Sequence, residues 1–185
     1  MLKSWAVGLT MFGCSLAMAQ SNRAAESSPV RQSLEKKLAG LEKQLLGIAE
    51  AMPAEHYSFA PTNGSFRGVR NFAKQLKHAA AVHYLIGAAI LEETPPAAAA
   101  DERGPDAVKT KAEVIQYMKD SFVYLRKAVA TIDAKNLAEP IKGAFGSGPE
   151  TRLGLVISAI GHSSNHYGQA VEYLRMNGVI PPPSE

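Results

Sequence analysis

Apolar residues recur every three or four positions along much of this chain, beginning after a polar leader at residues 20–28. The first such segment starts near Pro29 and stops at Pro53. Its apolar positions are Leu34, Leu38, Leu41, Leu45, Ile48 and Met52. This spacing places them on one face of a helix, and proline cannot continue a helix, so the pattern predicts an amphipathic helix ending at Pro53.

A second periodic segment runs from about Phe66 to Leu91, and from Ala79 onward it is apolar on nearly every side. Its stripe consists of Val69, Phe72, Leu76, Ala80 and Ile86. A helix that is apolar all round is typical of a buried position. The second helix is therefore expected to lie deepest in the fold.

Two further helices follow, and each has a recognisable end. Thr110 and Glu113 form the Thr-x-x-Glu pattern of a capping box, which predicts the start of a helix that continues to Ile132. The last helix spans roughly residues 151–177, and Gly178 is the residue type that favours a left-handed helix end. A proline-rich tail at residues 181–185 forbids continuation.

The four segments predict an all-α four-helix bundle over residues 29–180, since no strand-like alternation competes with them. The connection between the second and third helices is about 17 residues long. At ~3.3 Å per residue it can span more than the ~30 Å length of a 20-residue helix. Those two helices can therefore run parallel, which gives an up-down-down-up order.

The first 19 residues have the pattern of a cleaved signal peptide. Lys3 precedes an apolar run that ends in the small-x-small triplet at residues 17–19, so cleavage is expected after Ala19. The run is shorter than the ~20 residues of a membrane-spanning helix, so no permanent membrane span is expected. The mature protein is then periplasmic or secreted. Lipid attachment at Cys14 is the alternative, although the residues before it fit a lipobox poorly.

Charge and cysteine content narrow the chemistry. The formal net charge is only +3, and the sequence has no run of Lys or Arg that could contact successive phosphates of a nucleic acid. No nucleic-acid partner is therefore expected. Cys14 is the only cysteine, and it is lost on cleavage. The mature chain therefore has no thiolate to act as nucleophile or metal ligand.

His162 and His166 are one helical turn apart, a spacing that suits two imidazole ligands on one metal ion. They can equally be partly exposed helix residues, so a third ligand decides between the two interpretations. The second helix offers His78 and His83, and the loop residue His56 is a weaker candidate. Periodicity slightly favours His83, which continues the apolar stripe, but both can point inward from a helix that is apolar all round.

Two segments carry a family resemblance. HSSNHYGQAVEYLRMNGVIPP, at residues 162–182, resembles the C-terminal helix of the DinB/YfiT-like superfamily, and VRNFAKQLKHAAAVHYL, at residues 69–85, resembles its second helix. The resemblance implies that His78, His162 and His166 are the ligands. His83 then becomes a core residue or supports the ligands from outside.

The resemblance also implies a divalent metal ion, zinc or nickel, with coordination positions open to a small molecule. Metal-assisted transfer or hydrolysis is the expected chemistry, and no position in the sequence identifies a general base. The alternative is a non-catalytic metal-binding or stress-response bundle, and the resemblance is also compatible with a homodimer. Other metal sites are excluded by sequence, since Glu-x-x-His, HExxH and CxxCH motifs are all missing.

Overall fold

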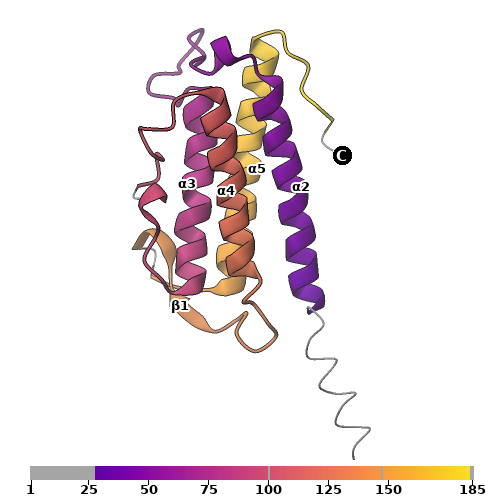
Figure 1. Cartoon of the computed structure of the whole chain (residues 1–185), viewed down its shortest axis with the longest axis vertical. Coiled ribbons are helices and arrows are strands. Elements are labelled where there is room, and N and C mark those ends of the chain that lie inside the picture. Colours follow the sequence, from indigo (N-terminus) through magenta and orange to yellow (C-terminus); the bar gives the residue numbers. More distant parts are fainter. Residues whose placement is uncertain (1–27, 100, 147, 184–185) are drawn as a thin grey trace, which may run out of the picture.

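The structure is a computed structural model that describes residues 28–99, 101–146 and 148–183. Four long helices make up most of these residues. They are α2 (Pro29–Ala51), α3 (Phe72–Leu91), α4 (Lys111–Val129) and α5 (Arg152–Met176). In Figure 1, α2 runs upward, α3 and α4 run downward, and α5 returns upward. The predicted four-helix bundle and its up-down-down-up order are confirmed.

A side-chain cap begins each helix. Ser28, Asn71, Thr110 and Thr151 each accept a hydrogen bond from the backbone N–H three residues further on. These bonds satisfy donors that have no partner inside the helix. The predicted capping box of α4 is present in full, because Glu113 also accepts from the backbone N–H of Thr110 at 2.8 Å.

Gly178 ends α5 as predicted. Its φ is +70°, a left-handed conformation that glycine adopts without strain. The N–H of Val179 bonds to the carbonyl of Leu174, and the N–H of Gly178 bonds to the carbonyl of Arg175, both at 3.0 Å. This pair of hydrogen bonds is the Schellman motif. The histidine pair therefore lies well inside an ordered helix.

The second helix starts later than the sequence pattern predicted, at Phe72 and not at Phe66. The side chain of Asn71 caps it, and Gly68 before the cap has a left-handed φ of +79° that interrupts any earlier helix. Phe66 and Val69 are 39% and 38% exposed, so they do not belong to the buried stripe. The apolar spacing of these two residues with Phe72 was coincidental.

A small hairpin was not predicted. It consists of β1 (Pro140–Lys142) and β2 (Pro149–Thr151), paired antiparallel with Ile141 opposite Glu150. Strands of three residues are too short to show alternation, and glycines and prolines surround them. Three short 3₁₀ turns complete the described elements: η1 (Ala54–His56), η2 (Ala97–Ala99) and η3 (Ala144–Gly146).

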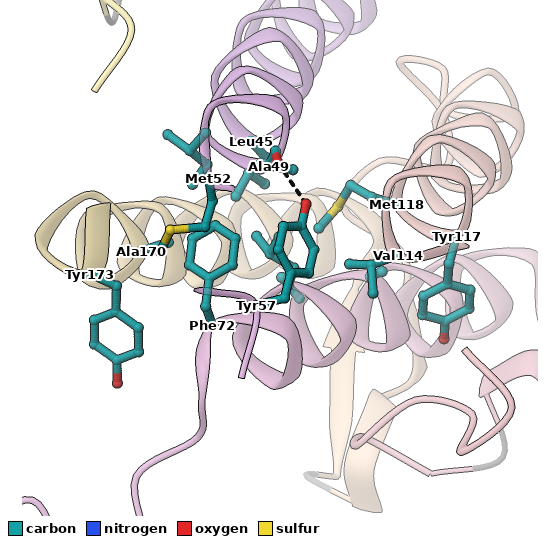
Figure 2. Packing of buried hydrophobic residues seen from close by; sticks show 14 of the residues in the cluster. Leu45, Ala49, Met52, Tyr57, Phe72, Val114, Tyr117, Met118, Ala170 and Tyr173 are labelled. Atoms are coloured by element: carbon teal, nitrogen blue, oxygen red, sulfur yellow. Dashed lines mark hydrogen bonds between the residues drawn. The ribbon is translucent and has the colours of Figure 1, made fainter. Parts of the chain in front are cut away.

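The loop after α2 is packed firmly against the bundle, and this fixes where α3 begins. Figure 2 shows the Tyr57 side chain directed toward α2, where its hydroxyl donates to the carbonyl of Ala49 at 2.6 Å. The Tyr57 ring meets the fully buried ring of Phe72 edge-on, with centroids 5.2 Å apart. The backbone N–H of Phe72 and that of Ala73 donate to this loop as well.

The long connection from α3 to α4 returns along the bundle and lies beside α3 (Figure 1). Gly104 lies close to this helix, because a Cβ at this position would lie 3.2 Å from the carbonyl oxygen of Lys77. Its φ of +73° is also left-handed. Only glycine fits both conditions, and the connection is thereby held against the first half of α3.

Two expectations concern the chain ends. The predicted signal peptide and the leader before Ser28 lie outside the described residues. Within the described residues, no helix combines the length and the apolar composition needed to cross a membrane.

Deleting residues 181–185 is expected to leave helicity and metal content almost unchanged. Pro182 lies beside Gly47 on α2, so the tail covers the outer side of α2 and α5, whereas the histidines face α3. Circular dichroism and metal analysis of the truncated protein measure the two quantities. Loss of metal from the truncated protein would show instead that the tail supports the histidines.

Candidate metal centre

Three histidines from two helices converge at one point between α3 and α5. The Nε2 atom of His162 lies 3.0 Å from that of His78 and 3.1 Å from that of His166. One ring nitrogen from each residue falls within 4.8 Å of the others. Among the described residues these three form the group that could hold a metal ion, and no carboxylate joins it.

The nitrogen separations suit a metal ion. Two ligands that bind one tetrahedral zinc at ~2.0–2.1 Å lie about 3.3 Å from each other. Without a proton or a cation between them, nitrogen lone pairs at 3.0–3.1 Å repel one another. A divalent cation among the three removes that repulsion, so the residues fit the metal that the fold implies.

The outer nitrogens of two ligands are held by oxygen atoms. Nδ1 of His78 lies 2.5 Å from the carbonyl oxygen of Glu102, and Nδ1 of His166 lies 2.6 Å from Oε1 of Gln75. Because these oxygens only accept, each Nδ1 must carry the proton. Nε2 then keeps its lone pair for a metal, the arrangement that outer-shell oxygens impose on metal-binding histidines.

Gln75 is itself oriented by a relay along α5. Its side-chain amide donates to Oε1 of Gln169 at 2.8 Å, and Gln169 donates to Oδ1 of Asn165 at 2.8 Å. Gln75 is 3% exposed. The relay therefore fixes which atom of the buried amide faces His166.

His162 differs from the other two ligands. Its Nδ1 is buried, and it has no hydrogen-bond partner among the described residues. The residue as a whole is only partly buried, whereas His78 and His166 are each 6% exposed. The His162 side of the group is therefore its more open side.

Burial and mutual proximity keep the three imidazoles neutral. Burial, followed by the neighbouring imidazoles and Arg70, lowers the pKa of His166 to about 3. The same causes, with His78 as the neighbour, lower the pKa of His162 to about 4. Burial also lowers the pKa of His78, against a raising effect of its bond to Glu102. Neutral imidazole is the form that binds a metal ion.

His83 is not part of the group. It is fully buried between α4 and α5, where Nδ1 lies 3.0 Å from Oγ of Ser121 and Nε2 lies 2.7 Å from Oγ of Ser163. The hydroxyl of Ser121 already donates its proton to the carbonyl of Met118, so it can only accept from Nδ1–H of His83. The unprotonated Nε2 of His83 then accepts from the hydroxyl of Ser163. Both nitrogens are thus occupied. Apolar periodicity slightly favoured His83 over His78 as the third ligand, but His83 lies outside the group of three histidines. His56, in η1, also lies outside this group.

Sequence reasoning missed the two groups that orient the ligands. Gln75 lies three residues before His78, so a search for polar residues on the same helix face could have found it. Glu102 acts through its backbone carbonyl from a connection without periodicity. No side-chain pattern signals such a contact.

Acidification is expected to destabilise the metal-free protein in part through His83. Burial, with a smaller effect of His162, lowers its pKa to about 3 in the folded protein, against ~6.5 in an unfolded chain. Between pH 7 and 5 the unfolded chain takes up a proton here and the folded protein does not. His83 alone should therefore lower the free energy of unfolding by on the order of 2 kcal/mol. Urea unfolding at both pH values should show a smaller loss for His83→Gln; parallel losses contradict a neutral His83.

Comparisons with known proteins agree with this architecture. The family model of the DinB superfamily matches residues 37–170. Two solved structures are similar, each with a TM-score of 0.64 and covering 82% of this chain. One is a conserved protein from Enterococcus faecalis (18% identity, 98% of its chain), and the other is a DinB-like protein from Bacillus cereus (12% identity, 95% of its chain). No curated protein sequence matches. The family match spans well over half of the 185 residues, and the chain therefore belongs to the DinB superfamily.

Proposed function

We propose that His78, His162 and His166 hold one divalent metal ion, zinc or nickel, through their Nε2 atoms. The observation that supports this is the convergence of three Nε2 atoms while oxygen atoms hold two of the opposite nitrogens. Three protein ligands leave coordination positions open, the pattern of catalytic and not of structural zinc sites.

The proposed activity is metal-assisted transfer or hydrolysis on a small molecule. A divalent ion at such a site supplies a Lewis acid that acidifies bound water or binds a thiolate or carboxylate. The chain's own residues hold the imidazoles in the neutral, Nδ1-protonated form through the carbonyl of Glu102 and the amide of Gln75. His162 is only partly buried, and we expect a ligand to enter on its side of the group.

A non-catalytic metal-binding or stress-response bundle is the second candidate. One observation favours it: among the described residues, no carboxylate belongs to the histidine group. An enzyme that moves protons generally places an acid or base within hydrogen-bond reach of the reacting atoms. The histidine group of the described residues thus offers no carboxylate for that role.

Metal analysis of protein purified from its own host compartment tests the metal site. About one equivalent of zinc or nickel is expected, and its absence after purification without chelators contradicts the proposal. Assays with thiol adducts and with esters then separate the two candidates. Turnover that disappears on metal removal supports the enzyme, and bound metal without turnover of either class supports the non-catalytic bundle.

We also propose that the protein is exported and that residues 1–19 are removed. The support is the apolar run that ends in the small-x-small triplet before Gln20. N-terminal sequencing of protein from the periplasmic or secreted fraction should begin at Gln20. A mature chain that still starts at Met1 contradicts export, and a lipid on Cys14 places the protein at a membrane surface.

A further inference from the structure

A buried chain of hydrogen bonds joins three helices beside the histidine group. The hydroxyl of Ser163 on α5 donates to Nε2 of His83 on α3 at 2.7 Å. Nδ1 of His83 donates to the hydroxyl of Ser121 on α4 at 3.0 Å, and this hydroxyl donates to the carbonyl of Met118 at 2.8 Å. The side chains of His83 and the two serines are at most 1% exposed. This network therefore ties α3, α4 and α5 together inside the core.

The network is not built to perform chemistry of its own. Ser163 and His83 lie as close together as a nucleophile and its general base. A hydroxyl that is 1% exposed, however, offers no room for a substrate. The network is also unsuited to relay a proton, because it ends on the backbone carbonyl of Met118. What it supplies is a set of directional bonds that hold the three helices in one arrangement.

The network lies next to the metal ligands on both helices that carry them. On α5, Ser163 directly follows His162 and precedes His166 by three residues. On α3, His83 follows His78 by five residues, about 7.5 Å along the helix axis. The bond between His83 and Ser163 thus fixes α3 against α5 close to the place where their imidazoles meet.

Apolar packing alone fixes this register weakly. Between Ala159 and Ala170, the buried residues of α5 are Ser163 and His166, and the apolar side chains of this stretch are only partly buried. On α3, three buried alanines follow His78. Apolar contact is non-directional, and small side chains form shallow ridges over which a helix can slide or rotate. A hydrogen bond of 2.7 Å resists both movements because it depends on direction.

We propose that His83, Ser121 and Ser163 are positioning residues for the metal centre. They set the register of α5 against α3, so that His162 and His166 meet His78. The inference rests on the proposed metal site and adds to it three residues that do not touch the metal. The arrangement that the network selects is the one in which the Nε2 atoms of the ligands converge.

The test measures Co²⁺ binding by the folded protein. Ser163→Ala is expected to weaken cobalt binding about tenfold, as if the competent register were occupied about one-tenth of the time. It should also change the visible absorption of bound Co²⁺, which reports how the ligands are arranged. Ser164→Ala is the matched control, because this exposed neighbour bonds to the carbonyl of Ile160 in its own helix. The control should change neither quantity.

A triple variant separates positioning from stability. Ser163→Ala alone leaves Nε2 of His83 buried without a partner, which lowers stability. Combining it with His83→Leu and Ser121→Ala removes every polar member of the network. Urea unfolding of the metal-free protein should then show higher stability than for Ser163→Ala alone. Cobalt binding by the triple variant should nevertheless stay at least about tenfold weaker than in the wild type.

The outcomes separate this inference from the metal site. Wild-type protein that takes up no cobalt overturns the metal site, and the inference with it. If the wild type binds cobalt and Ser163→Ala has the same affinity and the same spectrum, the inference alone is overturned. Recovery of wild-type affinity in the triple variant also overturns it, because the loss in Ser163→Ala then came from the unpaired imidazole and not from a changed register.

Discussion

Replacing any one of His78, His162 and His166 by alanine is expected to lower the affinity for a divalent metal by about 3 kcal/mol or more, at least a hundredfold. Each imidazole supplies one of only three protein bonds, and water must fill the vacancy. The expectation follows from the Nε2 atoms that lie 3.0 and 3.1 Å apart across the group. Titration with zinc or nickel above pH ~7 keeps free imidazoles neutral and measures the effect.

His83 provides the matched control on α3. It is a buried histidine five residues from His78, but it bonds to two serines and not to the other imidazoles. His83→Gln should therefore weaken metal binding by no more than the 10–100-fold expected of a residue outside the ligand set. Loss of binding in this variant together with normal binding in the His78 variant contradicts the ligand assignment. Normal binding in all four variants contradicts the site itself.

Replacing Phe122 by alanine is expected to lower the free energy of unfolding by about 3–5 kcal/mol. Phe122 is fully buried on α4, and its ring lies 4.5 Å from the ring of His83. Removing it leaves a cavity beside the buried histidine and the serines that bond to it. Urea unfolding of the metal-free protein measures the loss without a contribution from metal binding.

Val123 is the neighbouring control, since it lies on the same helix and is 60% exposed. Val123→Ala should change the free energy of unfolding by no more than about 0.5 kcal/mol. Similar effects of the two substitutions would mean that α4 does not present the Phe122 face to the core. The burial pattern of α4, and with it the position of Ser121, would then need revision.

The number and order of the helices could be predicted from the sequence because periodicity and caps report different things. Periodicity indicates which face is buried, whereas caps such as Thr110 and Gly178 mark where a helix starts or ends. The predicted start of the second helix, at Phe66, was wrong because Phe66 and Val69 repeat the apolar spacing without being buried. In that segment the cap, Asn71, was the better indicator.

For the candidate site, spacing could identify the pair on α5 but not the partner on α3. His78 and His83 are five residues apart, about 140° around a helix that is apolar on every side, so periodicity has no polar face to use as a reference. The choice depends on which helices pack on each side. His78 faces the pair on α5, and His83 lies between the serines of α4 and α5.

The contact between His78 and the carbonyl of Glu102 has a consequence for how this protein tolerates change. A backbone carbonyl is present whatever residue stands at position 102, so point substitutions there can alter the charge near the ligands without removing the contact. An insertion or deletion between Glu102 and Gly104 moves the carbonyl and is far more damaging. The length of the α3–α4 connection near this point is therefore under tighter constraint than its composition, and loop grafts should preserve that spacing first.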